Sequence, residues 1–350
     1  EIIHNEESLN QYINSIISTF GKNPILIDRF LSDAIEVDVD VIADKNLSIV
    51  AGIMEHIEEA GVHSGDSACT IPPHSLPAHT IKEIEKQSNT LAKALKVVGL
   101  MNIQFAIKDI ETDNPKIYIL EVNPRASRTV PFVAKATGNQ FAGIAARIMA
   151  GEKLSSFKIL PWYKTNKISV KEAVFPFGRF PGVDTLLGPE MKSTGEAMGL
   201  AQNFGQAFAK SQMAVGSNLP KSGTLFISVK DSDKIKILPI CKKLLKLGFD
   251  IIATKGTSKY LEINNIKVTK INKVSEGRPH LVDAIKDGLV NIIFNTTEGE
   301  QSIKESFSLR RAALSANIPY YTTLAGSKAA TEAIISINKD ELTVKSIQSY

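Results

Sequence analysis

The sequence has few cysteines, few aromatic residues and no long apolar run. Cys69 and Cys241 are the only cysteines among 350 residues, and they lie too far apart to form a metal-binding pair, which argues against disulfide frameworks and zinc sites. No apolar run reaches the roughly 18 residues that a membrane span needs. Basic residues are not interleaved with aromatic ones as on nucleic-acid-binding surfaces. The composition therefore predicts a globular protein of the cytoplasm, a reducing compartment, with neither a membrane nor a nucleic acid as partner.

The charge is divided unevenly along the chain. Residues 1–216 carry 21 basic and 24 acidic residues, a net charge of −3, and residues 217–350 carry 20 basic and 13 acidic residues, a net charge of +7. A basic second half suggests an anionic ligand, although a solvated lysine-rich surface is the commoner cause. The length accommodates two domains with separate cores. Because the chain begins at Glu1 without a leader, we expect a fragment or a processed chain.

Two expected strands form a hairpin in the first half. Residues 101–108 and 116–123 each mix polar side chains into an apolar alternation, and the polar loop 109–115 between them suits a hairpin connection. Side chains alternate between the two faces of a strand. The polar residues of the two strands can therefore share one face.

That face carries oxygen ligands, and two arginines follow it. Gln104, Glu121 and Asn123 offer carboxylate and amide oxygens, which suit a hard cation such as Mg²⁺ that bridges to substrate phosphates. Arg125 and Arg128 can each bind phosphate or carboxylate through two hydrogen bonds. Such a set fits phosphoryl transfer, where positioning and charge neutralisation do most of the catalysis. On spacing alone, a hairpin edge with solvated polar side chains explains the pattern equally well.

Other periodic segments predict the remaining elements of the first half. A strand at residues 36–40 places three carboxylates on one face, which suggests a cleft filled by cations or solvent, with a plain solvated face as the alternative. The glycines that flank residues 62–64 suit a loop that approaches a ligand closely. Apolar periodicity also predicts a buried strand at 24–30 and helices at 6–20, 79–98, 139–150, 193–198 and 203–215.

The second half repeats a strand-helix rhythm from residue 224 onward. Such alternation predicts a parallel sheet with helices on both faces, and ligands bind such sheets at the carboxyl ends of the strands. The strand end, glycine and helix start at residues 254–257 would offer backbone N–H groups to a phosphate. Lys234 and Lys273 could supply charge. The same turn is also common for purely structural reasons.

Long runs of the sequence resemble a known family. The runs MNIQFA and LEVNPRASR of the hairpin, MEHIEEAGVHSGDSAC at residues 54–69 and FPGVDTLLGPEMKSTGEAMG at residues 180–199 are similar to the carbamoyl phosphate synthase large chain, in its second, carbamate-phosphorylating half. The resemblance covers essentially the whole chain. It implies an α/β and α+β fold of two domains. Residues 1–216 would be the C-terminal part of an ATP-grasp domain, and residues 217–350 a methylglyoxal-synthase-like allosteric domain.

The resemblance also implies the chemistry of the first domain. It implies that ATP phosphorylates carbamate to carbamoyl phosphate for arginine and pyrimidine synthesis, with two Mg²⁺ or Mn²⁺ ions, with K⁺ as a further cofactor, and with a glutaminase small chain and a homo-oligomer as partners. Arg125 and Arg128 would be catalytic, and Gln104, Glu121 and Asn123 would hold the metals. The positions that match nucleotide contacts are Leu31, Glu36, Gly61, Val62, His63, Ser64, Gln104 and Glu121.

Two effector sites are implied as well. The positions that match a site for a nucleotide monophosphate, UMP or IMP, are Ser228, Lys234, Thr254, Gly256, Thr257, Lys273, Asn295 and Thr297. The positions that match a site for ornithine are Glu58, Asp66, Glu172, Tyr320 and Thr322.

The chain departs from the family pattern, and the loop of residues 109–115 is longer than is usual between these strands. Tyr321 stands where many members have Asp, which alters one ornithine-facing position. The segment NTTEGEQ lacks the catalytic aspartate of true methylglyoxal synthases, so binding rather than catalysis is expected there. The glycine-rich lid and the early lysine and arginine that hold the ATP phosphates in ATP-grasp enzymes are missing from this sequence. Two alternatives therefore remain: another ATP-grasp ligase of the biotin carboxylase kind, which would lack the second domain, and a nucleotide-sensing module without catalysis.

Overall fold

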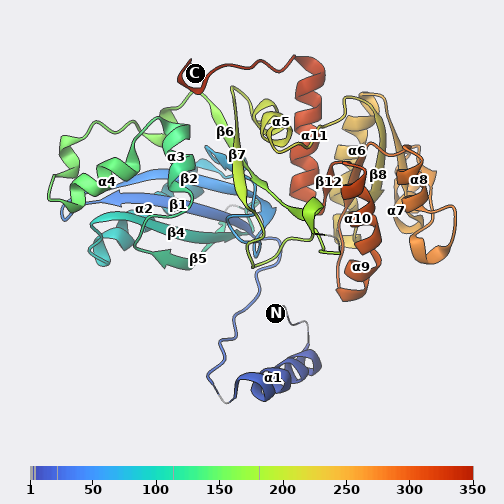
Figure 1. The fold of residues 1–350 in the computed structure, drawn as a ribbon, viewed down its shortest axis with the longest axis horizontal. Helices are drawn as coiled ribbons and strands as arrows, with labels where there is room; N and C mark the ends of the chain where they lie inside the picture. The colour runs from blue at the N-terminus through green and yellow to red at the C-terminus, as the bar shows by residue number, and fades with distance from the viewer. Residues whose placement is uncertain (1–2, 4, 22, 113, 181, 350) are drawn as a thin grey trace.

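The computed structural model describes residues 3, 5–21, 23–112, 114–180 and 182–349. Their fold is built around two β-sheets (Figure 1). The strands of the first sheet are β1 (Ile35–Ala43), β2 (Ser48–Glu59), β3 (Cys69–Ile71), β4 (Gly99–Lys108), β5 (Lys116–Asn123), β6 (Ile168–Val174) and β7 (Gly195–Ala201). Those of the second are β8 (Gly223–Ser228), β9 (Phe249–Ala253), β10 (Thr269–Lys270), β11 (Ile292–Asn295) and β12 (Tyr320–Tyr321).

The two sheets differ in strand direction. The first has the order β5-β4-β1-β2-β3-β6-β7, and its neighbouring strands are antiparallel. The second has the order β10-β9-β8-β11-β12, and its neighbouring strands are parallel. The predicted mixed fold, with a parallel sheet in the second half, is confirmed.

Helices pack against both sheets, and those of the second half cover both faces of the second sheet. The helices of the first half are α1 (Glu6–Phe20), α2 (Ala78–Ala94), α3 (Val130–Thr137), α4 (Phe141–Met149) and α5 (Phe204–Ala214). Those of the second half are α6 (Lys234–Lys246), α7 (Lys255–Ile263), α8 (Leu281–Lys286), α9 (Glu300–Glu305), α10 (Phe307–Ser315) and α11 (Leu324–Lys339). Short 3₁₀ helices are η1 (Leu154–Ser156), η2 (Trp162–Lys164), η3 (Phe177–Arg179), η4 (Asp231–Asp233), η5 (Val274–Glu276) and η6 (Ile347–Ser349). Within the described ranges, no helix is both long and apolar enough to cross a membrane.

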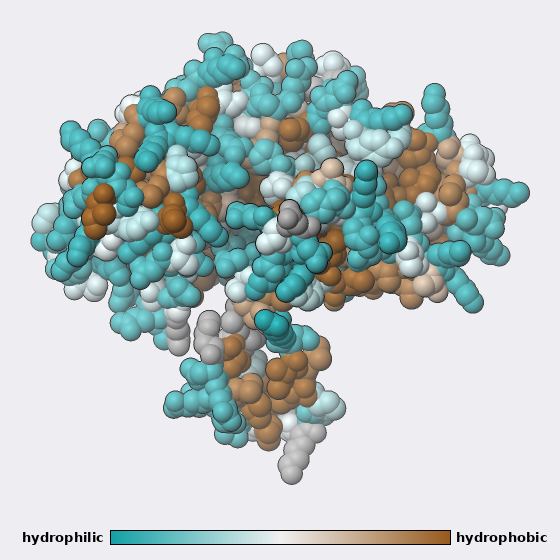
Figure 2. All heavy atoms as spheres, turned by 180° about the vertical axis from the view of Figure 1, so that it is seen from behind, coloured by the Kyte–Doolittle hydropathy of each residue, from teal (hydrophilic) through white to brown (hydrophobic). Residues whose placement is uncertain are grey.

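The predicted buried strand at residues 24–30 is wrong. The segment has no regular secondary structure, and Leu26 and Ile27 are 84% and 64% exposed. A strand forms only when a neighbour accepts its hydrogen bonds, and β5 and β7 are the edges of the first sheet. In Figure 1 the segment lies below the sheet and connects it to α1. In Figure 2 apolar side chains gather on the surface formed by α1 and this segment.

The predicted helix at residues 193–198 is also wrong, because residues 195–198 belong to β7 and residues 193–194 form neither helix nor strand. Pairing with β6 in a seven-residue antiparallel register outweighs the helical propensity of Glu196, Ala197 and Met198. Gly199 explains the close packing of β7 on α5. A Cβ at this position would lie 2.0 Å from the Ala207 carbonyl oxygen.

The two sheets share one apolar cluster. α5 packs on β6 and β7 and also against α11, while α11 contacts β2 and α6. The cluster joins Val170 of the first sheet, Phe208 of α5, Ile334 of α11 and Ile227 of the second sheet. In Figure 1, α5 and α11 stand side by side between the sheets. The domain division at residue 216 therefore remains a prediction, with one sheet on each side of it and a common core between them.

Candidate functional site

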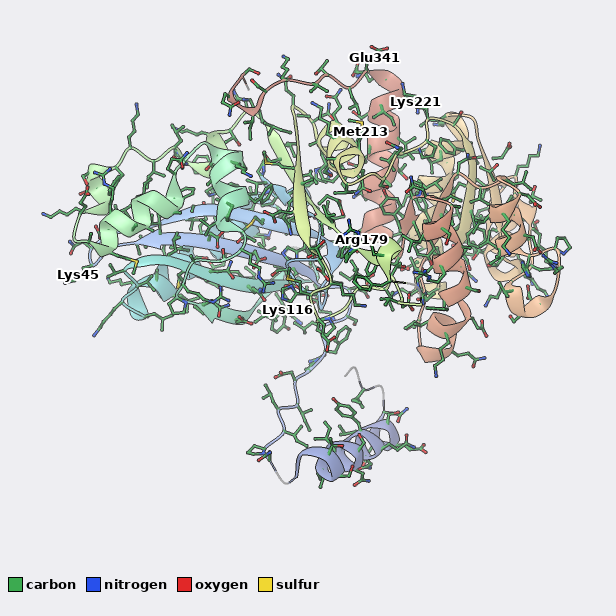
Figure 3. The ribbon with its side chains drawn as sticks, in the orientation of Figure 1. Lys45, Lys116, Arg179, Met213, Lys221 and Glu341 are labelled. Carbon is green, nitrogen blue, oxygen red and sulfur yellow. The ribbon has the colours of Figure 1, made fainter. Side chains whose placement is uncertain are left out.

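The β4–β5 hairpin contributes to a cavity of about 450 Å³. β1 and the turn after β2 contribute further lining residues, and so does the segment that follows β5. In Figure 3, Lys116 marks the start of β5, and Lys45 marks the turn between β1 and β2 at the outer end of the same sheet. We call this cavity the catalytic cavity, after the role that the sequence predicts for it. The sequence-predicted residues that line it are Glu36, Gly61, Val62, His63, Ser64, Gln104, Glu121, Asn123, Arg125 and Arg128.

Strand register brings the expected metal ligands together. Gln104 pairs directly with Glu121, and Asn102 pairs with Asn123. The Nδ2 group of Asn123 donates a hydrogen bond to Glu121 Oε1. A bulge after Gln104 leaves Leu120 without a partner in the ladder and shifts the alternation of β5 by one residue. The alternation of side chains in the sequence does not reveal this bulge. The bulge sets the register in which Gln104, Glu121 and Asn123 line the same cavity.

The donor set fits a hard divalent cation. Glu121 supplies carboxylate oxygens, Gln104 supplies an amide oxygen, and Asn123 keeps its Oδ1 for a cation while its Nδ2 donates to Glu121. Over the described ranges, no group of three or more His, Cys, Asp or Glu side chains is arranged to hold a metal. A cation bound at the hairpin would therefore depend on amides and on substrate phosphates in addition to the one carboxylate.

Buried carboxylates continue the cavity across β1. Burial raises the pKa of Glu36, and the nearby Asp38 and Glu121 carboxylates add to this rise. Asp38 Oδ2 and His56 Nε2 share a hydrogen bond of 3.0 Å, and both side chains are buried. Burial would lower the pKa of His56, but contacts with Cys69 and Asp38 outweigh it and raise this pKa well above its usual range. These contacts favour the charged form of His56 beside the carboxylates of β1.

The turn from Gly61 to Ser64 forms another side of the catalytic cavity. Gly61 has a φ of +100°, which only glycine adopts easily, and its N–H donates to Glu36 Oε2 at 3.3 Å. The His63 N–H donates to the Gly188 carbonyl at 2.8 Å. The buried Lys171 donates from Nζ to the Ser64 carbonyl at 3.0 Å. Contacts from β1, from the segment at 188 and from β6 therefore fix the turn that was expected to border a nucleotide.

Some residues of the catalytic cavity were not assigned to it from the sequence. Asn102, Ser127 and Thr129 line it together with Asp38. Asn102 precedes Gln104 by two positions on one strand face, and this spacing was an available signal. Leu31, expected to pack on adenine, is not among the lining residues and is partly buried elsewhere, because the segment before it does not form the expected strand.

A second cavity of about 470 Å³ lies at the carboxyl ends of strands in the second sheet. We call it the effector cavity, after the role that the sequence predicts for it. Five of the predicted nucleotide-binding residues line it: Ser228, Thr254, Lys273, Asn295 and Thr297. The three others do not: Lys234, Gly256 and Thr257.

Contacts explain these placements. Lys234 Nζ forms an ion pair with Asp231 Oδ1 at 2.6 Å. The Thr257 hydroxyl accepts the Val229 N–H at 3.2 Å. Thr254 shares a hydrogen bond of 2.9 Å with Ser228. Residues from α9 and α10, such as Ser302 and Leu309, complete the wall of the effector cavity. No pattern in the sequence predicted that they would line it.

A third cavity of about 280 Å³ lies between the two halves, and all five predicted ornithine positions line it. Burial raises the pKa of Glu172 to about 8 and that of Glu58 to about 7, and each pKa is raised further by a neighbouring carboxylate. The Asp66 carboxylate accepts hydrogen bonds from the backbone N–H groups of Lys192 and Ser193, at 2.8 and 2.9 Å. Asp66 therefore shapes the wall of this cavity and already has its hydrogen bonds.

Tyr321 fills the altered position of this third cavity. Its hydroxyl donates to Gln212 Oε1 at 3.1 Å. Burial raises the pKa of Tyr321 well above its usual range, and Glu172 and Glu58 raise it further. An uncharged phenol thus stands where a carboxylate would add negative charge to an already acidic cavity.

Comparisons with known proteins follow the same division. Residues 1–157 match the family described as carbamoyl-phosphate synthase L chain, ATP binding domain, and residues 236–322 match the MGS-like domain. Carbamoyl phosphate synthase large chains of Mesorhizobium japonicum and Methanobrevibacter smithii are 52% and 50% identical over 376 and 350 residues. These alignments cover 100% of this chain but only 32% and 33% of the relatives. The chain therefore spans about one third of the length of the curated relatives it matches.

Among solved structures, the biotin carboxylase domain of a thermophilic 2-oxoglutarate carboxylase is 17% identical, with a TM-score of 0.47. The match covers 62% of this chain and 55% of that chain. We infer nothing from so distant a likeness.

Proposed function

Because the chain belongs, as one part, to the carbamoyl phosphate synthase large-chain family, we propose that the complete enzyme phosphorylates carbamate with ATP at the catalytic cavity. The product would be carbamoyl phosphate for arginine and pyrimidine biosynthesis. The observation that carries this proposal is the placement of Gln104, Glu121 and Asn123 on the same cavity as Arg125 and Arg128. We place the enzyme in the cytoplasm, together with a glutaminase small chain that binds through the rest of the large chain.

The cavity has groups for several requirements of phosphoryl transfer. Arg125 and Arg128 would bind the carbamate and the transferring phosphoryl group, and their fixed charges stabilise negative charge as it spreads over the oxygens. Glu36 would accept hydrogen bonds from the ribose hydroxyls, and residues 61–64 would border the nucleotide. Catalysis would then come mainly from alignment of donor and acceptor.

Divalent ions complete the proposal. Gln104, Glu121 and Asn123 would hold Mg²⁺ or Mn²⁺, and the ions would neutralise phosphate charge and orient the transferred group. Two such ions and a K⁺ ion belong to the same proposal, and for K⁺ no ligand is assigned.

The test is ATP formation from ADP and carbamoyl phosphate by the complete enzyme. We expect Glu121→Gln to lower this rate by about 10²- to 10³-fold, as loss of one preorganised charged group does in other active sites. Glu111→Gln is the matched control, since Glu111 is exposed on the loop of the same hairpin. It should leave the rate unchanged. A Glu121→Gln enzyme that forms ATP at the rate of the control would remove the hairpin from the chemistry.

A second function, nucleotide sensing, is favoured by the effector cavity. Its hydroxyls at Ser228, Thr254 and Thr297 and the charge of Lys273 suit a phosphate. We propose that UMP or IMP binds there and alters the rate at the catalytic cavity, and that ornithine is a ligand of the third cavity. Calorimetric titration of UMP and IMP into the complete enzyme tests the first point. Absence of heat and of a thermal shift with both nucleotides would refute it.

A further inference from the structure

We propose that Asp40 is a positioning residue for phosphoryl transfer, which holds the arginine-bearing segment between β5 and α3 in place. This inference rests on the proposed function and concerns the same cavity. Asp40 does not line the catalytic cavity. It would act through the residues that do.

Asp40 lies in the middle of the first sheet and is 1% exposed. Its neighbours on β1 alternate with it toward the opposite face, where Val39 and Val41 belong to the apolar core. Across the sheet, Asp40 pairs with Asn102 of β4, and Asn102 pairs with Asn123 of β5. A buried carboxylate is thus fixed by strand register two strands away from an expected metal ligand.

The carboxylate accepts three hydrogen bonds from the walls of the catalytic cavity. Asn102 Nδ2 donates to Oδ1 at 3.0 Å, Ser127 Oγ donates to Oδ1 at 2.7 Å, and Thr129 Oγ1 donates to Oδ2 at 2.7 Å. Ser127 Oγ and Thr129 Oγ1 also lie 2.7 Å apart. Asp40 therefore ties β4 and the segment after β5 to β1 through both of its oxygens.

This segment needs such an anchor. Residues 124–129 form neither helix nor strand, and the arginines they carry are exposed. Ser127 and Thr129 flank Arg128 directly, so their bonds to one buried carboxylate define the path of the chain at Arg128. A guanidinium on a long flexible side chain stabilises a transition state well only when its backbone is held.

The cost of keeping a carboxylate here supports a functional role. Burial raises the pKa of Asp40 to about 6, and the three hydrogen bonds from Asn102, Thr129 and Ser127 oppose that rise. An apolar residue in the sheet would avoid this cost, since buried charge is unfavourable unless it is well bonded. Because Asp40 holds the arginine-bearing segment, a role in catalysis would explain why a carboxylate is kept at this buried position.

The experiment uses the complete enzyme and measures kcat and KM for ADP in ATP formation from carbamoyl phosphate. Asp40→Asn keeps the shape but removes one acceptor. Thr129→Val removes one donor, and Thr129→Ser restores it. Thr137→Val is the matched control, since the Thr137 hydroxyl is equally buried but donates to the Val133 carbonyl within α3. Thermal unfolding of each variant reports the loss of stability separately.

We expect Asp40→Asn and Thr129→Val to lower kcat by about 10- to 100-fold, with KM for ADP changed by less than about threefold. Thr129→Ser should return kcat to that of the parent. Thr137→Val should lower the unfolding temperature and leave kcat unchanged. This pattern would separate positioning from a general loss of stability.

Two results would overturn the inference in an active parent enzyme. One is a Thr129→Val enzyme with the kcat of the parent, and this variant remains informative even if Asp40→Asn fails to fold. The other is a Thr137→Val enzyme that loses as much activity as Thr129→Val. A parent enzyme that forms no ATP from carbamoyl phosphate would instead refute the proposed function, and this is measured before any variant is compared.

Discussion

The catalytic cavity and the effector cavity differ in the way their residues are held. In the catalytic cavity the predicted metal ligands lie on neighbouring antiparallel strands, and register fixes the pairs Gln104–Glu121 and Asn102–Asn123. In the effector cavity the polar groups come from strand ends and from the segments that follow them. Strand register can therefore fix the predicted cation ligands rigidly, whereas the donors proposed for an anion come from segments that are far apart in the sequence.

The two cavities also differ in charge. Carboxylates and amides face arginines in the catalytic cavity, an arrangement that suits a cation between protein and phosphate. Hydroxyls and Lys273 dominate the predicted set in the effector cavity, and Lys273 Nζ lies 3.6 Å from Glu305. We therefore expect loss of charge to abolish chemistry in the first cavity and to weaken binding in the second.

Among the variants that compare the two cavities, the largest effect is expected at Arg128. Arg128→Lys keeps the charge but loses the planar pair of donors that matches a phosphoryl group. We expect ATP formation by the complete enzyme to fall about 10²-fold, with binding of a nucleotide effector unchanged. Arg179→Lys is the control, since Arg179 is exposed and does not line the catalytic cavity (Figure 3). Equal rates for the two variants would show that the charge of Arg128 suffices.

A smaller effect is expected from Lys273 of the effector cavity. Lys273→Met should weaken binding of UMP about tenfold in calorimetric titration, because one charge-assisted hydrogen bond to phosphate is lost. The rate of ATP formation without effector should stay at the parent value. Lys270→Met is the control, since Lys270 is exposed on β10 and does not line the cavity. Unchanged UMP affinity in Lys273→Met would exclude this lysine from the site.

The smallest effect concerns the cavity between the two halves. The pKa of Glu172 is raised to about 8 by burial and by Glu58, while Lys171 and Gln212 oppose the rise and Tyr321 lies close by. The folded state therefore keeps a proton that the unfolded chain loses near pH 4.5. The protonated Glu172 stabilises the fold fully below about pH 4.5. This contribution to the free energy of unfolding decreases as the pH rises from 4.5 to about 8, and it is lost above that.

Glu172→Gln removes this dependence. We expect the variant to unfold about 2–4 °C above the parent at a pH above the Glu172 pKa, with the difference vanishing in acid. Glu196→Gln on the neighbouring β7 is the control, since Glu196 is exposed. A parallel pH dependence of parent and Glu172→Gln would mean that Glu172 ionises as freely in the fold as in the unfolded chain.

The sequence predicted the catalytic cavity better than the effector cavity, for a physical reason. Alternation along β4 and β5 is local, so the shared face of Glu121 and Asn123 followed from spacing alone. The wall formed by Ser302 and Leu309 depends on how α9 and α10 pack, and no local pattern encodes such packing. The same limit applies to Arg310, which is 2% exposed and donates from Nε to Asp184 Oδ1 at 2.6 Å, although 126 positions separate the two residues.

The wrong elements follow the same rule. Residues 193–198 have helical propensity, but pairing with β6 and the contact of Gly199 with α5 make part of them a strand. Residues 24–30 have the composition of a strand but pair with no neighbour among the described residues. In both cases a contact distant in sequence, or the lack of one, decided the structure, as tertiary context often does.

The most direct test of the central claim is the binding of Mn²⁺ to the complete enzyme in the presence of ADP. Wild type, Glu121→Gln and Glu111→Gln would be titrated side by side and the bound metal counted. We predict that Glu121→Gln binds less Mn²⁺ per chain than wild type, because its carboxylate is lost from the set on β4 and β5, while Glu111→Gln matches wild type. Equal Mn²⁺ binding by all three proteins would contradict the account, since it would place the metal away from the hairpin.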